Sequence, residues 1–217
     1  MTRKALIFHG GWDGHEPGPC SGIVEALLAA EGMEVTRVEG TAILATADLR
    51  AFDLIVPVMT MAEVEKAEVA ALGAAVEAGC GLGGFHGGMC DTFRRNTEYQ
   101  FMTGGQFVAH PGNVIDYRVE MVAAGDPLLQ GIGDFDYRSE QYYMHVDPRI
   151  EVLATTTFSG EHAPWVAGTR MPVVWKHRHG RGRVFYSALG HKAAEFDHPQ
   201  MKEILRRGLL WAARDDN

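Results

Sequence analysis

The sequence predicts an α/β fold in which a mostly parallel sheet is covered by helices on both faces. Strand-like runs alternate with helical segments through short connections between residues 5 and 85, an order that places the strands in parallel. The runs are continuously apolar and not alternating, as expected of strands buried on both sides. A chain of 217 residues can bury roughly 70% of its unfolded surface, so we expect a single domain over residues 1–217.

In the first half the predicted elements follow the apolar periodicity. They are strand 5–8, a helix around 23–31 capped by Ser21 and ending near Gly32, strands 35–38 and 54–58, helix 63–78 and strand 80–85.

In the second half, short β-like runs, glycines and aromatic residues replace the helical periods between residues 97 and 166. The predicted elements are extended runs at 114–122 and 151–156, strands at 172–175 and 184–187, and a closing helix over 200–213. The apolar face of that helix holds Met201, Ile204, Leu205, Leu209 and Trp211. The basic run 176–183 has no interleaved aromatic residue and is predicted to be a hairpin turn with solvated charges.

Composition excludes several classes of protein. A net charge of −8 leaves no excess of cations to neutralise phosphates, which argues against binding nucleic acid. The chain has no run of 18 apolar residues and no visible signal peptide, so we expect neither a membrane span nor export. Cys20, Cys80 and Cys90 are irregularly spaced and indicate a reducing cytoplasm. A homo-oligomer is compatible with this size, although the sequence specifies no interface.

The most informative motif is Gly-Gly-Phe-His-Gly-Gly at 83–88, between an apolar run and a helix start. It has the form of a nucleophile elbow, a sharp strand-to-helix turn that presents its central residue. Hydrolases and amidotransferases of this kind place Ser or Cys at the centre, where this chain has His86. An imidazole serves better as a metal ligand or general base than as an acyl-transfer nucleophile. The alternative is an ancestral site that has become a structural turn.

Three histidines, His9, His86 and His191, each follow a predicted strand. Since the carboxyl ends of parallel strands meet at one edge of the sheet, we expect the three imidazoles to share a cavity. His86 and His191, together with Glu140 or Glu195, could then hold a divalent metal such as Zn or Mn. The chain has no HExxH or CxxC signature, so this expectation depends on the folding alone.

Other residues could bind a substrate. Gly10 and Gly11 offer backbone donors, although a tight glycine turn would look the same. Further candidates are His110, in a second glycine-containing loop, and His145 and Tyr142, which lie close to Glu140 in sequence. Aromatic side chains beside a carboxylate suit a sugar, yet an ordinary strand with a partly buried glutamate would also fit.

Several segments together carry a resemblance to a known family. They are 85–88, 91–94, 96–100, 104–112, 139–148, 173–176, 180–186 and 189–191. Through them the chain resembles the ThuA-like (trehalose utilisation) family of the class I glutamine amidotransferase-like superfamily. The resemblance implies a flavodoxin-like three-layer sandwich with the elbow histidine in place of cysteine. It also implies sugar metabolism, commonly beside dehydrogenases that make 3-keto-glycosides. Many relatives carry Asp-Glu where this chain has Ser139-Glu140.

Together these features favour an enzyme that acts on a disaccharide or a 3-keto-glycoside, a lyase or hydrolase and not a glutamine amidotransferase. His86, His191 and Glu140 would hold a metal or move protons, and His9, His110 and Tyr142 would orient hydroxyls. The most concrete mechanism is a metal-assisted enolisation with elimination across the glycosidic bond. One alternative is a sugar-binding accessory protein without turnover. Another, an amidotransferase that uses Cys90, is disfavoured because Cys90 lies outside the elbow's central position.

Overall fold

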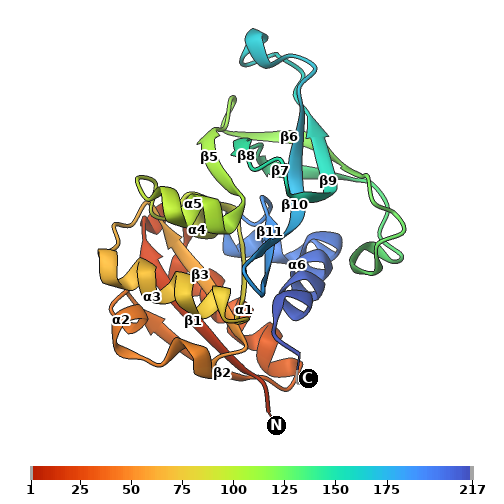
Figure 1. The fold of residues 1–217 in the computed structure, drawn as a ribbon. Coiled ribbons are helices and arrows are strands. Elements are labelled where there is room, and N and C mark those ends of the chain that lie inside the picture. The colour runs from red at the N-terminus through yellow and green to blue at the C-terminus, as the bar shows by residue number, and fades with distance from the viewer. Residues whose placement is uncertain (1, 216–217) are drawn as a thin grey trace.

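The computed structural model describes residues 2–215, in which nine strands form one sheet in the order β2-β1-β3-β4-β11-β10-β9-β6-β7 (Figure 1). A separate two-stranded sheet pairs β5 with β8. The strands are β1 (Lys4–Gly11), β2 (Glu34–Glu39), β3 (Leu54–Thr60), β4 (Gly81–Phe85), β5 (Gly105–Ala109), β6 (Val114–Met121), β7 (Phe135–Glu140), β8 (Tyr143–Val146), β9 (Glu151–Thr157), β10 (Arg170–His179) and β11 (Gly182–Ser187).

The sheet is mixed, which corrects the prediction of a mostly parallel sheet. The strands β2, β1, β3, β4 and β11 run parallel to their neighbours. From β11 through β10, β9 and β6 to β7 every pairing is antiparallel. The parallel half follows the predicted alternation of strands and helices. The antiparallel half corresponds to residues 97–187, where helical periods are sparse and hairpin connections suffice.

Helices cover both faces of the parallel half. The helices are α1 (Pro17–Ala30), α2 (Ile43–Thr46), α3 (Lys66–Glu77), α4 (His86–Cys90), α5 (Thr97–Thr103) and α6 (Pro199–Ala212). α1 packs beside α6, and α3 packs beside α2 and α5. Every residue of β3 between them is buried, as its continuous apolar sequence predicts.

Two helix starts differ from the prediction. α1 begins at Pro17, not after Ser21, because a proline at the first position needs no hydrogen-bond partner for its nitrogen. Ser21 lies inside the helix, and its hydroxyl donates to the carbonyl of Gly18. α5 was not predicted, although its start and end carry ordinary signals. The Asn96 side chain accepts from the Tyr99 N–H, and Gly104 ends the helix with a φ of 78°.

The basic run 176–183 forms the predicted hairpin between β10 and β11. Its charges are only partly solvated, which corrects the sequence interpretation. Lys176 is buried, and its ammonium lies against Asp126 and Glu151 and over the ring of Trp211. Trp211 is accordingly half-buried at the margin of α6 and not in its buried face.

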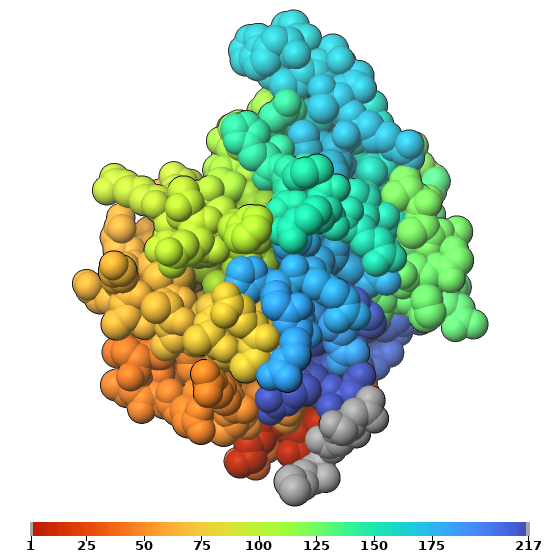
Figure 2. Space-filling view, viewed as in Figure 1, coloured from red at the N-terminus to blue at the C-terminus, as the bar shows by residue number. Residues whose placement is uncertain are grey.

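The connection between β9 and β10, around residues 158–169, projects from the top of the molecule (Figure 2). Trp165 on this projection is 85% exposed. Within residues 2–215, no helix combines the length and the apolar character needed to span a membrane.

Candidate functional site

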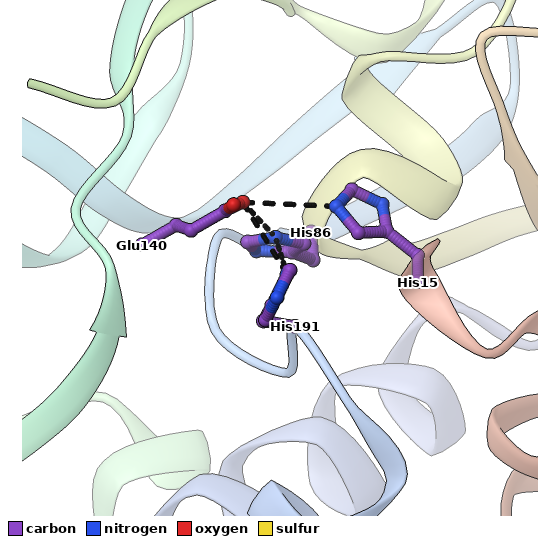
Figure 3. Close-up of side chains that lie close together, drawn as sticks. All are labelled: His15, His86, Glu140 and His191. Atoms are coloured by element: carbon purple, nitrogen blue, oxygen red, sulfur yellow. Dashed lines mark hydrogen bonds and ion pairs between the residues drawn. The ribbon is translucent and has the colours of Figure 1, made fainter. Parts of the chain in front are cut away.

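Four buried side chains converge at the carboxyl edge of the parallel strands (Figure 3). They are His15, His86, Glu140 and His191, and one ligand atom from each lies within 4.8 Å of the others. His15 ends the short 3-10 helix η1 (Asp13–His15), and His191 lies in the loop after β11. His86 begins α4 and Glu140 ends β7. The fold therefore assembles one cluster, here called the His₃Glu cluster, from four separate segments.

His86 occupies the predicted elbow, where β4 passes directly into α4. Its φ is 46°, a left-handed conformation that costs a non-glycine residue about 1–3 kcal/mol. A Cβ on Gly84 would lie 2.8 Å from the Cβ of Met89, and one on Gly88 would lie 3.1 Å from the Cα of Val58. The flanking glycines are therefore required by close packing, and the elbow holds its central imidazole in a fixed place.

Hydrogen bonding fixes the tautomer of His86. Its Nδ1 lies 2.8 Å from the carbonyl oxygen of Ala188, which can only accept, so Nδ1 carries the proton. Burial lowers the pKa of His86 to about 4 despite the neighbouring carboxylate of Glu140, which keeps the ring neutral near pH 7. Its Nε2 therefore presents a lone pair to the Oε2 of Glu140 at 3.1 Å.

The other two imidazoles point at the same carboxylate oxygen. The Nδ1 of His191 lies 3.3 Å from the Oε2 of Glu140 and 3.3 Å from the Nε2 of His86. The Nδ1 of His15 is hydrogen-bonded to the Thr60 hydroxyl at 2.8 Å. This contact turns the Nε2 of His15 inward, 3.6 Å from the Oε2 of Glu140.

The charges of the cluster suit a bound cation. Burial opposes ionisation of Glu140, but the contacts of its carboxylate with the imidazoles of His15, His191 and His86 hold the pKa of its carboxyl well below the usual range. The Nε2 lone pair of His86 and the Oε2 of the Glu140 carboxylate are therefore two acceptors 3.1 Å apart, which a shared cation would bridge. Zinc–nitrogen and zinc–oxygen bonds of about 2.0–2.1 Å in a tetrahedron separate the ligand atoms by about 3.3 Å. The three imidazole nitrogens lie 3.1–3.6 Å from the Oε2 of Glu140, close to this spacing, and the four ligand atoms as a whole lie within 4.8 Å of one another.

Glu195, the alternative acidic ligand, does not point into the cluster. Its carboxylate accepts from the backbone N–H of His191 at 3.0 Å, from the Ser139 hydroxyl at 3.0 Å and from the Tyr137 hydroxyl at 2.6 Å. Glu195 therefore fixes the loop that carries His191. The Ser139 hydroxyl thus donates a hydrogen bond to the residue that supports this loop.

Two predicted substrate-binding residues lie against the cluster. Tyr142 stacks on His86 with ring centroids 4.1 Å apart, and it is buried, so it holds the imidazole from one side. The Nε2 of His110 lies 3.7 Å from the Oε1 of Glu140, the carboxylate's second oxygen. The His110 side chain is 32% exposed, against 9% or less for the cluster residues, so His110 links the cluster to solvent.

His9 does not join the cluster, so the expectation of three gathered imidazoles is wrong for this residue. β1 continues to Gly11, which places His9 inside the strand, and its Nε2 lies 3.4 Å from the Nη1 of Arg37. Gly10 and Gly11 are likewise strand residues. A Cβ on Gly11 would lie 2.1 Å from the Thr60 carbonyl oxygen, so Gly11 permits close strand packing. His145 pairs with Gln106 in the small sheet, and its side chain is exposed.

His15 takes the place expected for His9, although no role was predicted for it. The signal was a second histidine in a glycine-rich segment after the first strand. Gly87 makes room for it. A Cβ on Gly87 would lie 2.6 Å from the Cε1 of His15 and 3.1 Å from the Cγ2 of Thr60. The glycine beside the elbow is therefore part of the site.

The chain is similar to known proteins in both sequence and fold. The family model ThuA, described as trehalose utilisation, matches residues 4–212. A ThuA-like protein from Bacteroides uniformis ATCC 8492 has a TM-score of 0.79 at 19% identity, with 97% of this chain and 91% of that chain covered. One from Parabacteroides merdae ATCC 43184 has a TM-score of 0.79 at 17% identity, covering 98% and 90%.

A more distant neighbour is a protein from Salmonella typhimurium LT2 described as cytoplasmic. It has a TM-score of 0.67 at 11% identity, with 98% of this chain and 100% of that chain covered. At these identities the solved structures show a shared fold alone. No curated protein is similar enough in sequence to count as a match.

Proposed function

Because the chain belongs to the ThuA family, described as trehalose utilisation, we propose that it is an enzyme acting on a disaccharide or a 3-keto-glycoside. Membership supports a role related to trehalose utilisation. The observation that carries the proposal is the His₃Glu cluster, in which ring nitrogens of three imidazoles lie 3.1–3.6 Å from one oxygen of an ionised carboxylate. Such a group offers four ligand atoms to a single cation, an arrangement that a purely structural turn does not require.

The cluster fits a divalent metal, and we propose Zn or Mn with His15, His86, Glu140 and His191 as ligands. When bound, such an ion polarises a carbonyl or hydroxyl oxygen as a Lewis acid. The chain's own groups prepare this chemistry. Ala188 holds the tautomer of His86 through Nδ1, in the manner of the outer partners that orient metal-binding histidines.

Proton transfer is assigned to His110. It lies 3.7 Å from the second oxygen of Glu140, and its side chain is 32% exposed, so its imidazole can exchange a proton with solvent between turnovers. On a 3-keto-glycoside it would remove the proton on C2, which the neighbouring ketone makes acidic. The electron pair then forms the C1–C2 double bond, the bond from C1 to the glycosidic oxygen breaks, and that oxygen leaves as an alcohol after taking up a proton.

The remaining expectations belong to the same proposal. The partner is a small-molecule sugar and not nucleic acid, given the net charge of −8. We place the protein in the cytoplasm, with support from the Salmonella neighbour described in that way and from the absence of any membrane-spanning helix among the described residues.

Turnover of a 3-keto-disaccharide by the protein loaded with Zn or Mn tests the proposal. We expect His86→Ala and His191→Ala to lower kcat by at least about 100-fold and to lose bound metal by elemental analysis. His145→Ala is the matched control, because that side chain is exposed and pairs with Gln106 away from the cluster. Unchanged turnover in both cluster variants would reject the mechanism. Sugar binding by calorimetry without any turnover would instead identify a non-catalytic accessory protein.

A further inference from the structure

Trp12 is a large aromatic side chain that the fold leaves half-exposed beside the His₃Glu cluster. It is 48% exposed, and its ring meets that of His15 edge to face with centroids 4.8 Å apart. The ring of His15 lies 4.8 Å from that of His86 and 4.9 Å from that of His191. A single imidazole therefore separates the exposed indole from the cluster.

The local backbone holds the indole in place. The N–H of Trp12 donates to the carbonyl of Thr60 at 2.9 Å, which ties the residue to the end of β3. A Cβ on Gly14 would lie 2.2–2.5 Å from three atoms of the indole ring, so the ring rests directly on the glycine backbone. One side of Trp12 is thus packed against Gly14 and His15 while the rest faces solvent. A rigid exposed indole loses little conformational freedom when a ligand covers it.

We propose that Trp12 is a stacking platform for the second, non-reacting ring of a disaccharide, an inference that rests on the proposed function. The face of an aromatic ring carries negative charge density, and the axial C–H bonds of a pyranose present the complementary positive surface. The two rings of a disaccharide are joined by one oxygen atom and lie side by side. Because only the ring of His15 separates Trp12 from the cluster, with centroids 4.8 Å apart, a sugar ring at the cluster would have its neighbour beside the indole, and the site would prefer disaccharides to monosaccharides.

Calorimetric titration with trehalose and with glucose tests this inference apart from the proposed elimination, which needs a ketone that trehalose lacks, and product analysis after the titration checks that trehalose is not converted. We expect the wild-type protein to bind trehalose at least tenfold more tightly than glucose. Trp12→Ala should lose about tenfold in affinity for trehalose, the equivalent of 1.4 kcal/mol, with glucose binding unchanged. Trp12→Phe should keep most of the preference. Trp165→Ala is the matched control, an indole 85% exposed on the projecting β9–β10 connection.

The inference is overturned if the wild-type protein shows no preference for trehalose, if Trp12→Ala keeps that preference, or if both sugars lose affinity equally. Metal content is measured in each variant. A fall in Trp12→Ala would mean that the indole acts only by holding His15, which also overturns the inference. Failure of the proposed function would give a different result. The protein would then not convert the keto-sugar, yet its preference for trehalose would still depend on Trp12. That outcome would reject the proposed enzyme activity and keep the role of Trp12 in binding.

Discussion

Gly87→Ala is expected to weaken metal binding although no ligand is removed. The added Cβ would lie 2.6 Å from the Cε1 and 2.8 Å from the Nδ1 of His15, and 3.1 Å from the Cγ2 of Thr60. Since ordinary contacts between such atoms begin near 3.4 Å, the imidazole must move by close to 1 Å. That movement breaks the 2.8 Å hydrogen bond between His15 and Thr60 and takes Nε2 away from the cluster.

The expected magnitude follows from the tolerance of a metal site. In a well-formed metal site the metal–ligand distances lie within about 0.2 Å of their ideal values. Loss of a residue that orients a ligand typically lowers metal affinity by about 10–100-fold. We therefore expect Gly87→Ala to bind Zn about 10–100-fold more weakly. Overpacking of a buried position adds a loss of about 1–3 kcal/mol in the free energy of unfolding of the metal-free protein.

The assay is a Zn titration against a competing chelator, with urea unfolding of the metal-free protein in parallel. Gly22→Ala is the matched control, because within the described residues no atom lies within 4 Å of a Cβ placed there in α1. That change should leave Zn affinity unaltered and raise helix stability by roughly 0.5–1 kcal/mol. If Gly87→Ala binds Zn as tightly as the wild-type protein while His15→Ala binds it more weakly, then Gly87 does not determine the position of the His15 ring, and the prediction is refuted.

Two further predictions concern buried titratable groups. Burial lowers the pKa of His86 from 6.5 to about 4. Between these pH values the unfolded chain binds a proton at this residue that the native protein does not bind. The free energy of unfolding of the metal-free protein should therefore fall by about 3 kcal/mol as the pH is lowered from 6.5 to 4. Urea unfolding measured across this pH range should show that the unfolding free energy of His86→Asn depends less steeply on pH than that of the wild-type protein. An equal dependence on pH in both proteins would contradict the lowered pKa of His86. Burial also raises the pKa of the Cys20 and Cys80 thiols to about 12, and that of Cys90 well above its usual value. The native protein at pH 8 should therefore not react with a disulfide reagent that labels the denatured chain, and a fast-reacting native thiol would show that one of them is an accessible nucleophile.

Much of the parallel half of the fold could be predicted because its signals are local. The apolar runs of β3 and β4 and the helical period of α6 depend only on residues that are close together in the sequence. The mixed character of the sheet could not be predicted in this way, since the direction of β9 and β10 depends on pairings between distant segments. The start of α1 was missed because Ser21, a good capping residue, competed with Pro17, a good first residue.

The sequence alone determined that His86 stands at a strained turn, because Gly84 and Gly88 leave the backbone room to form an elbow. It also indicated that His191 and Glu140 are candidate metal ligands or acid–base groups. That His15 joins them in place of His9 was decided only by the tertiary structure. β1 runs two residues past His9, whose ring then contacts Arg37, and the following turn brings His15 inward instead. A cluster built from four segments depends on distances across the fold, and no spacing along the chain encodes those distances.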